Sequence, residues 1–360
     1  MQILISGASF AGLASAFWMT QLGHTVTIVE LAPDLRWGGT AVNIIGDTVD
    51  ICRRMGILDA VEANRMHLCR LDIKAEDDST IRSNPIEPSE HDIEIERNVL
   101  LRLLKSLVTS ELVFGDTITA LHQTGTGVDV TFAKSPARRF DLVLGCDGIH
   151  STVRKLAFGH EAEYMHFLEQ YFSITIVDKL LIDRDTISMF NVPGKAIMLN
   201  AYKANTDIIF SFVSEKELPY DHRDEAQQRR IIAEQFATVP WRARELLREI
   251  DHSTSFYFDK LCQIRMPQWS KGRVVLVGDA GYCASPAAGM GGSLALDGAA
   301  AFADAMREHA DLSSAFASYD ARLRPFVDEI QAQAVKTGLE TLVPRTAEAI
   351  EARNTREQMF

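Results

Sequence analysis

The sequence predicts an α/β fold: a Rossmann-like domain with a parallel sheet, an inserted β-sheet domain and C-terminal helices. Three short apolar runs, at residues 3–5, 142–145 and 274–277, are each followed by a turn and a helix-forming stretch. Between them lie segments in which apolar and polar residues alternate, as they do in half-buried strands. A strand followed by a turn and a helix is typical of parallel sheets, whereas alternating strands favour an antiparallel one.

The first apolar run leads into a glycine-rich turn at residues 7–12. Gly7 permits a sharp turn, and Gly12 lets the following helix approach the strand closely. The unpaired N–H groups of the first helical turn then face a phosphate group. Ser9 stands at the middle position, where a glycine is usual, and Phe10 and Ala11 begin the helix.

The second strand, residues 26–30, ends at Glu30, about 20 residues beyond the turn, which is the usual spacing of an acid that binds a ribose. This layout predicts a site for a dinucleotide. A tight turn that binds nothing is the alternative interpretation of the glycines when they are considered alone.

Two later segments strengthen the dinucleotide interpretation. Asp147 and Gly148 follow the second apolar run, and Ser151 is placed to cap the next helix. Asp279 ends the third run, and an apolar helix opens further along the chain. The residues before and at the start of that helix are Pro286, Gly289, Gly291 and Gly292. Each segment alone fits an ordinary turn and cap, but the three together favour one shared dinucleotide.

With these segments in this order, the chain resembles the single-component FAD-dependent monooxygenases. This aromatic hydroxylase family includes para-hydroxybenzoate hydroxylase and the tetracycline-degrading flavin monooxygenases. The resemblance covers nearly the whole chain, including residues 318–325. It implies non-covalent FAD, NADPH or NADH as reductant, and dioxygen and a small aromatic molecule as substrates. In this family a flavin C4a-hydroperoxide transfers the oxygen atom in a site that excludes water.

The resemblance also assigns residues to parts of the cofactor. It implies that Glu30 binds the adenosine ribose, that Asp279 lies at the ribityl or pyrophosphate region, and that Arg97 reaches FAD from its helix start. The complete set of FAD contacts that it implies is Gly7, Ser9, Phe10, Ala11, Gly12, Glu30, Arg36, Gly39, Arg97, Asp147, Asp279, Pro286, Gly289, Gly291 and Gly292.

The chain departs from the family pattern at several positions. Gly281 and Tyr282 stand where the family usually has Ala and His, Ser293 where it often has Asn, and Gly298 where it often has Asp. No catalytic side chain is certain, and Tyr282 and Pro286 are the candidates near the flavin ring. A packing role is the alternative for Tyr282.

Substrate contacts are predicted from strand spacing alone. Phe210 and Phe212 share one face of a predicted strand, so they are candidates for lining the substrate pocket or for the core. The default place for a substrate is the cleft between the nucleotide domain and the inserted sheet. The ten histidines show no metal-ligand spacing, and no metal is expected.

The order of the segments predicts a discontinuous domain organisation. An FAD-binding domain is expected from residues 1–70, 97–158 and 268–325, a substrate-binding domain from 71–96 and 159–267, and a C-terminal helical segment from 326–360. Within the second domain, 71–75 and 93–95 are expected to form a hairpin, 222–237 and 241–250 helices, and 255–264 a strand. Two helices, 326–342 and 345–357, are expected at the end.

Composition excludes several classes of protein. The net charge of −12 and the isoelectric point near 5.3 argue against a nucleic-acid partner. Five scattered cysteines without a Cys-x-x-Cys pair suit a reducing, cytoplasmic environment. No apolar run reaches the length of a membrane span, so no stable membrane association is expected. The oligomeric state and the choice between NADH and NADPH are not determined by the sequence.

Three functional classes fit these observations. The leading one is an NAD(P)H-dependent FAD monooxygenase that hydroxylates an aromatic or polycyclic small molecule. The second is an FAD-dependent oxidoreductase without oxygen insertion, because all the FAD-binding features would be the same. The third is an FAD-binding protein that sequesters a ligand or acts on a partner. Fold alone does not separate them.

Overall fold

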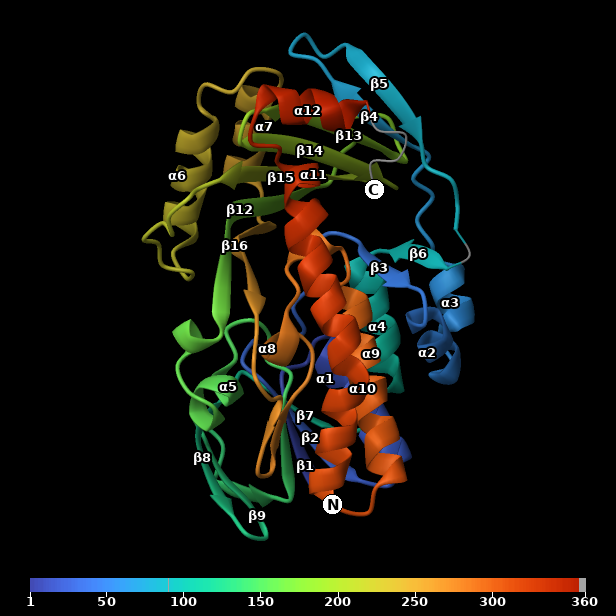
Figure 1. Ribbon diagram of the computed structural model, residues 1–360, viewed down its shortest axis with the longest axis vertical. Helices are drawn as coiled ribbons and strands as arrows, with labels where there is room; N and C mark the ends of the chain where they lie inside the picture. Colours follow the sequence, from blue (N-terminus) through green and yellow to red (C-terminus); the bar gives the residue numbers. More distant parts are fainter. Residues whose placement is uncertain (90, 356–360) are drawn as a thin grey trace.

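A six-stranded sheet forms the lower part of the molecule in the computed structural model, which describes residues 1–89 and 91–355 (Figure 1). The strand order is β17-β18-β11-β1-β2-β7, and all neighbours are parallel except β17 and β18. Its strands are β1 (Gln2–Ser6), β2 (Thr25–Glu30), β7 (Glu111–Phe114), β11 (Leu142–Gly145), β17 (Ser270–Lys271) and β18 (Val274–Leu276). The central strands are buried, which explains their continuous apolar sequences.

Long helices pack together beside this sheet (Figure 1). Helix α1 (Phe10–Gln21) packs against α4 (Arg97–Leu107) and α9 (Gly291–Glu308), and α9 packs against α10 (Leu312–Gln333). The shorter helical elements are α2 (Thr48–Arg54), α3 (Leu58–Glu62), α5 (Thr152–Ala157), η1 (Glu161–Glu163), α8 (Asp279–Tyr282) and η2 (Pro286–Ala288). A small antiparallel sheet consists of β8 (Ile118–Thr124), β9 (Gly127–Phe132) and β10 (Arg138–Phe140).

A second, seven-stranded sheet forms the upper part of the molecule (Figure 1). Its order is β16-β12-β15-β14-β13-β4-β5, and all neighbours are antiparallel except β13 and β4. Its strands are β4 (Arg70–Lys74), β5 (Thr80–Pro85), β12 (Met165–Val177), β13 (Thr186–Val192), β14 (Lys195–Tyr202), β15 (Asn205–Val213) and β16 (Phe256–Ile264). Helices α6 (Glu225–Phe236) and α7 (Ala243–His252) cover one face.

The predicted hairpin between residues 71–75 and 93–95 is wrong. Strand β4 pairs with β5, whereas β6 (Asp92–Ile95) pairs with β3 (Val42–Ile45) in a separate two-stranded sheet. Alternation of apolar and polar residues identifies a half-buried strand, but it does not identify the partner of that strand. The β3–β6 pair therefore connects the segment that follows β5 with the segment that follows β2.

The C-terminal helices also begin and end differently from the prediction. Helix α10 begins at Leu312 and runs through Pro325, because its packing against α9 holds the helix across the proline. The chain continues through a π-helical turn, η3 (Ala334–Gly338), into α11 (Leu339–Leu342) and α12 (Ala347–Asn354). The last two residues of the predicted helix 345–357 lie outside the described residues.

Candidate active site

The glycine-rich turn brings three chain segments into contact. Gly7 has a φ of 102°, and a Cβ there would lie 2.4 Å from the carbonyl oxygen of Cys146, just before the Asp147–Gly148 turn. A Cβ on Gly12 would lie 1.9 Å from the carbonyl oxygen of Gly7. Only glycine fits at either position, so the start of α1 lies directly against the carboxyl ends of β1 and β11.

Glu30 lies beside this turn and is nearly buried. Its carboxylate accepts hydrogen bonds from the backbone N–H groups of Ala8 and Ala32, both at 2.9 Å. The exposed side chain of Arg36 places its Nε 3.7 Å from the same carboxylate. Ser9, the N-cap residue of α1, makes no capping hydrogen bond with its side chain. The structure therefore brings the predicted acid and the predicted turn together.

Arg97 closes over the turn from the start of α4. Its guanidinium donates to the backbone oxygens of Arg36 at 2.7 Å and Gly38 at 2.9 Å, and to Ser9 Oγ at 3.4 Å. It also lies 5.4 Å from the centre of the Phe10 ring. Burial lowers the pKa of Arg97, although the group stays cationic at neutral pH because an arginine pKa starts so high.

Gly39 is required by the position of the Arg97 side chain. Its φ is 91°, and a Cβ at this residue would lie 2.7 Å from Arg97 Cδ. The backbone N–H of Gly38 donates to the side-chain oxygen of Asn98 at 2.8 Å, which fixes the loop to α4. The two glycines and the arginine predicted near the cofactor thus form one packed unit.

Asp279 reaches the same turn from the other side. Gly278 has a φ of 71°, and a Cβ there would lie 2.8 Å from Ala11 Cβ. Asp279 follows directly as the first residue of α8 and remains exposed to solvent. The protein that surrounds it on the other sides raises its pKa. A solvent-accessible carboxylate beside a helix N-terminus suits a ligand that offers hydroxyl groups.

Asp147 has a local structural role in addition to any ligand contact. Its carboxylate accepts from the Ser151 hydroxyl at 2.5 Å and from the backbone N–H of Val153 at 3.1 Å. Ser151 Oγ in turn accepts from the backbone N–H of Arg154 at 2.9 Å. These bonds build the start of α5, and burial raises the pKa of Asp147.

The segment from Pro286 to Gly292 lies against β3. Gly289 is left-handed with a φ of 65°, and its backbone oxygen accepts from Asn43 Nδ2 at 3.4 Å. A Cβ on Gly292 would lie 3.2 Å from Val42 Cβ, whereas a Cβ on Gly291 would meet no atom within 4 Å. The N-terminus of α9 therefore packs closely on one side and is open on the other.

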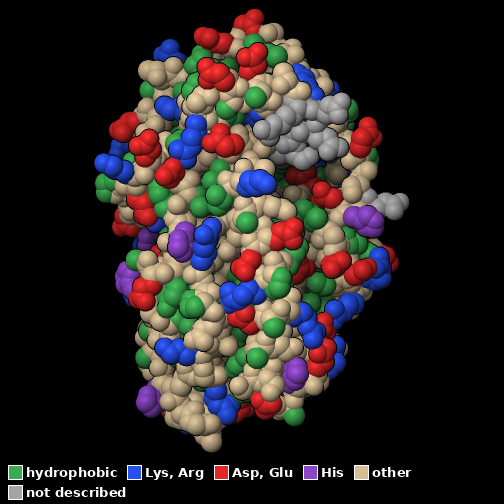
Figure 2. All heavy atoms as spheres, viewed as in Figure 1, with side chains coloured by type: hydrophobic (Ala, Val, Ile, Leu, Met, Phe, Trp, Pro, Cys, Tyr) green, Lys and Arg blue, Asp and Glu red, His purple; other side chains and the backbone are tan. Residues whose placement is uncertain are grey.

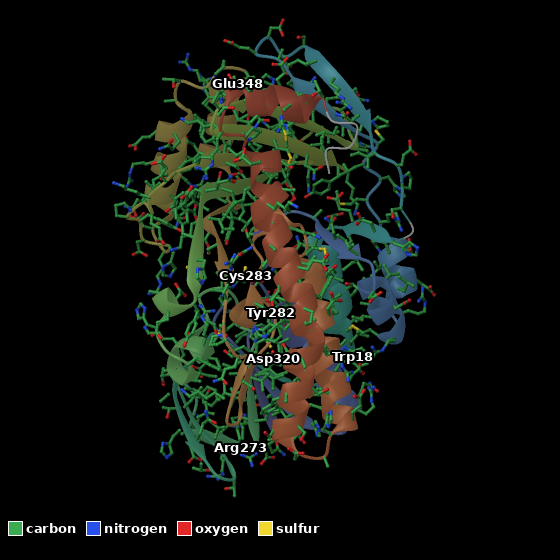
Figure 3. The ribbon with its side chains drawn as sticks, viewed as in Figure 1. Trp18, Arg273, Tyr282, Cys283, Asp320 and Glu348 are labelled. Atoms are coloured by element: carbon green, nitrogen blue, oxygen red, sulfur yellow. The ribbon has the colours of Figure 1, made fainter. Side chains whose placement is uncertain are left out.

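Tyr282 is a core residue and not a contact near the ring, so this prediction is wrong. The side chain is 1% exposed and its hydroxyl accepts from Tyr319 at 3.0 Å. Its ring centre lies 4.6 Å from that of Trp269. Figure 3 shows Tyr282 and Cys283 in the middle of the molecule, beside α10. Tyr282 fills this space because Gly298 opposite has no side chain.

Phe210 and Phe212 do not line a pocket. Both are fully buried between the second sheet and α6, and their ring centres lie 4.5 and 6.4 Å from that of Phe236. The spacing correctly placed them on one face of a strand, but it did not show which face the helices cover. Because strand residues alternate, Ile209 and Ser211 lie on the opposite, inner face.

The residues on the inner face of the second sheet are not among those predicted from the sequence, although the cleft beside the inserted sheet is. Register places Ile174, Ile209 and Met198 side by side across β12, β15 and β14, and each is only partly buried. Tyr257 of β16 continues this row and is 48% exposed. Further along the same face, Phe172 and Leu261 pack with Ala287 of η2 and Leu339 of α11. That cluster joins the sheet to the Pro286–Ala288 segment.

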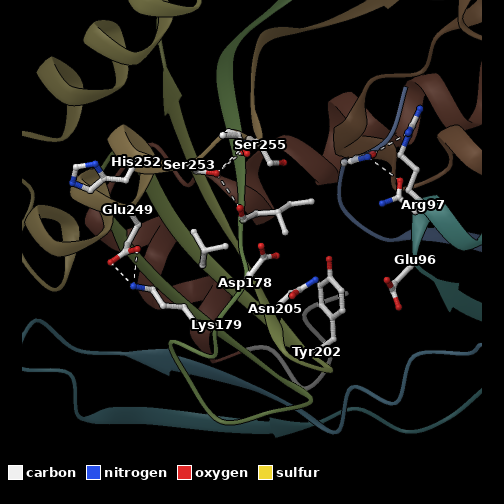
Figure 4. Close-up of a pocket in the computed structure, with 16 residues that line it drawn as sticks. Glu96, Arg97, Asp178, Lys179, Tyr202, Asn205, Glu249, His252, Ser253 and Ser255 are labelled. Atoms are coloured by element: carbon white, nitrogen blue, oxygen red, sulfur yellow. Dashed lines mark hydrogen bonds and ion pairs between the residues drawn. The ribbon is translucent and has the colours of Figure 1, made fainter. Parts of the chain in front are cut away.

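A polar cavity of about 440 Å³ lies between the Arg97 loop and the second sheet. Figure 4 shows Arg97 and Glu96 at one end and Lys179, Glu249 and His252 at the other. Lys179 forms an ion pair of 2.8 Å with Glu249. Among the residues that the structure describes, no group of His, Cys, Asp or Glu side chains could hold a metal ion.

Comparison with known proteins shows the family to which the chain belongs. Residues 1–334 match a family model described as FAD binding domain. The chain is 33% identical to a flavin-dependent monooxygenase from an unknown prokaryotic organism, over 98% of this chain and 94% of that protein. The chain belongs to the FAD-dependent monooxygenase family. A flavin-dependent monooxygenase from Legionella longbeachae is 31% identical, over 92% of this chain and 87% of that protein.

The fold of this FAD-dependent monooxygenase is similar to that of solved relatives. The crystal structure of tetracycline destructase Tet(51) has a TM-score of 0.89 and 31% identity, covering 99% of this chain and 95% of that chain. FAD is the cofactor of this family, and NAD(P)H is its usual reductant. The relatives favour the monooxygenase class over the two alternatives drawn from the sequence.

The surface of the monooxygenase carries both signs of charge. On the face shown in Figure 2, acidic and basic side chains are interspersed over both halves of the molecule. Within residues 1–89 and 91–355, no helix is long and apolar enough to cross a membrane.

Proposed function

We propose that this monooxygenase uses NAD(P)H and dioxygen to hydroxylate an aromatic or polycyclic small molecule. The observation that carries the proposal is the partly exposed apolar row on the inner face of the second sheet, formed by Ile174, Ile209 and Met198. An apolar sheet face beside a cavity suits a flat apolar ligand. The tetracycline destructases of similar fold act, by their name, on a polycyclic molecule.

The residues around the glycine-rich turn fit non-covalent FAD. The close approach at Gly7 and Gly12 leaves the N–H groups of α1 open to a pyrophosphate, with Arg97 above them as a partly buried cation. We assign Glu30 to the adenosine ribose and Asp279 to the ribityl or pyrophosphate region. The hydrogen bond from Ala8 N–H to Glu30 and the position of Asp279 at the start of α8 support this assignment. We assign the remaining contacts around these groups to backbone atoms of the glycine-rich segments.

When it is bound, FAD supplies the redox and oxygen-transfer chemistry. The protein supplies position, charge and exclusion of water. The N-terminus of α9, open at Gly291, stabilises negative charge on the ring by its helix dipole and N–H groups. Pro286 and the apolar row of the second sheet then hold the substrate against the ring and keep the site dry.

The function is tested by following NAD(P)H oxidation with a panel of phenols and tetracycline, together with the mass of each product. Hydroxylation adds one oxygen atom to the product. Turnover without that mass change would instead indicate an oxidoreductase without oxygen insertion, and FAD binding without turnover would indicate sequestration. NADH and NADPH should be compared in the same assay, because the residues around the cleft do not distinguish them.

Two further properties follow from the same proposal. Denaturation should release all of the flavin as free FAD, because no residue in the site is placed as an attachment point. We also propose a cytoplasmic location, since all five cysteines are free thiols and four of them are buried.

A further inference from the structure

An exposed tyrosine lies on the inner face of the second sheet. Tyr257 lies on the edge strand β16, is 48% exposed, and its ring centre is 5.6 Å from that of Phe172 on the inner face. The same end of β16 approaches the cofactor loop, because a Cβ on Gly38 would lie 3.6 Å from Ser255 Oγ. Tyr257 also interacts electrostatically with Arg97. Its hydroxyl is therefore next to the space proposed for FAD and substrate.

Tyr257 is hydrogen-bonded to a buried carboxylate. Its hydroxyl donates to Asp259 Oδ2 at 3.1 Å, and Asp259 lies two residues further along the same strand face. The other carboxylate oxygen accepts from the Tyr220 hydroxyl at 2.8 Å and from the backbone N–H of Lys260 at 2.8 Å. Burial opposes ionisation of Asp259, but the nearby His150 and the hydrogen bond from Tyr220 outweigh it and lower the pKa.

His150 connects this carboxylate to the surface. Its Nε2 lies 3.6 Å from Asp259 Oδ2, and its Nδ1 lies 3.2 Å from both oxygens of Glu161. The His150 side chain is 36% exposed. Hydrogen bonds to Asp259 and Glu161 raise the pKa of His150 to about 9 against the effect of burial. The imidazole is thus protonated at neutral pH.

Other titratable side chains also lie around His150. The His222 ring stacks on it with centres 5.3 Å apart, and Arg154 forms an ion pair of 3.1 Å with Glu161. The charge of Lys260, a residue of β16, lowers the pKa of Glu161. These groups surround an imidazolium that lies between two carboxylates, one facing the interior and one facing solvent.

We propose that Tyr257, Asp259 and His150 form a chain that carries one proton from the surface to the cleft. The inference rests on the proposed function, because hydroxylation with NAD(P)H and dioxygen consumes one proton per turnover and forms one water molecule. A cleft that excludes water must receive that proton through protein groups.

The transfer balances along the chain. The Tyr257 hydroxyl turns from Asp259 toward the cleft and gives its proton to an oxygen atom of the bound reactants. It then takes a proton from Asp259 Oδ2, which takes one from His150 Nε2. His150 then regains a proton from solvent. Every residue returns to its starting state, and one solvent proton has entered the cleft. Tyr257 is the group that touches the reacting partners, and Asp259 and His150 act through it.

The first test uses the FAD-free protein, so it does not depend on activity. With ¹³C labels at tyrosine Cζ and histidine Cε1, the Tyr257 signal should shift together with the His150 titration, at a midpoint near pH 9. In Asp259→Asn the Tyr257 signal should lose this shift, and the His150 midpoint should fall toward about 6.5, the ordinary imidazole value. A Tyr257 signal that ignores the His150 titration in the parent protein would overturn the chain.

The second test measures turnover with substrate and NAD(P)H. Tyr257→Phe and Asp259→Asn should slow product formation at least about tenfold, as expected for loss of a proton-transfer group. They should also raise the solvent deuterium isotope effect, and high concentrations of imidazole buffer should restore the rate. Tyr164→Phe is the matched control, because the Tyr164 hydroxyl donates to the backbone oxygen of Phe158 at 2.9 Å and has no part in this chain.

The two tests separate failure of this inference from failure of the proposed function. If no compound is hydroxylated by the parent protein, the function is wrong, and the NMR titration still decides whether the three residues are linked. If the parent protein hydroxylates but Tyr257→Phe matches it in rate and isotope effect, the proton reaches the cleft by another route and the inference is wrong.

Discussion

The hydroxyl of Tyr282 fills the space that a side chain at position 298 would need. A Cβ built on Gly298 would lie 1.8 Å from Tyr282 Oη and 3.0 Å from its Cζ. In the sequence, these two positions are separate departures from the family pattern. In the structure they form one pair, in which a large ring on α8 packs against a gap on α9.

We expect Gly298→Ala to destabilise the protein by about 1–3 kcal/mol, the usual cost of overpacking a full core. The added methyl group displaces the Tyr282 hydroxyl and breaks its hydrogen bond from Tyr319. Urea unfolding of the FAD-free protein measures the change. Gly125→Ala is the control, since no atom lies within 4 Å of a Cβ there. A second substitution, Tyr282→Phe, should recover part of the loss, and a Gly298→Ala protein as stable as its parent would disprove the pairing.

The same pair shows what could and could not be predicted from the sequence. The sequence predicts a turn at Gly7 and Gly12 and places Glu30 at the end of the next strand. The structure brings them together, because turn geometry is local and only glycine satisfies it. The position of Tyr282 depends on contacts with residues far along the chain, such as Tyr319. A resemblance predicts which position of the family fold a residue occupies. It does not predict where the side chain points when the residue differs from that of the family.

The face of each strand that meets the helices was the second feature that could not be predicted from the sequence. The period of two correctly grouped Phe210 with Phe212, but the face that meets the helices depends on where α6 packs. If the position of α6 had been known first, the alternation of side chains from Asp207 to Ser211 would have identified the inner face. His150 and Asp259 lie far apart in sequence, and no local pattern links them.

Stability of the FAD-free protein should fall as pH rises from about 4 to about 7. Burial, together with the charges of Asp92 and Asp207, raises the pKa of Glu94 to about 7, and burial raises that of Asp207 to about 6. Both acids therefore hold a proton more tightly in the folded state than in the unfolded chain. As the pH rises, the unfolded state loses these protons first, so the free energy of unfolding decreases.

Glu94→Gln should remove much of this pH dependence. At pH 8 the variant should be more stable than the parent by about 1–3 kcal/mol, on the scale of 1.36 kcal/mol per pKa unit, and at pH 4 the two should be equal. Urea unfolding at several pH values measures both. The exposed Glu87→Gln is the control. A parent protein whose stability rises between pH 4 and 7 would show that other groups dominate.

Glu30→Ala and Asp279→Ala should each weaken FAD binding by about one to two decades, which corresponds to about 1–3 kcal/mol for an unpaired hydroxyl. Glu30 also holds the N–H groups of Ala8 and Ala32, so its loss disturbs the turn as well. Titration of the FAD-free protein followed by flavin fluorescence gives the dissociation constants. Asp129→Ala, on the exposed side of β9, is the control. Equal affinity in well-folded variants would remove these carboxylates from the FAD site.

Gly291→Val tests the position of the flavin ring. A Cβ there meets no protein atom within 4 Å, so we expect the folded protein itself to tolerate the substitution. The added group instead enters the open space at the start of α9, where we place the ring. We expect FAD to remain bound but NAD(P)H oxidation to yield hydrogen peroxide in place of hydroxylated product, because the ring no longer settles against the helix N-terminus.

The comparison of Gly291 with its neighbour Gly292 makes this test specific. A Cβ on Gly292 points at Val42, 3.2 Å away, so Gly292→Ala should affect packing against β3 before it affects the ring. The expected result is therefore a stable but uncoupled Gly291→Val protein beside a Gly292→Ala protein that loses stability and keeps its coupling. If Gly291→Val hydroxylates as efficiently as its parent, the open side of α9 does not face the flavin, and the ring must lie elsewhere in the cleft.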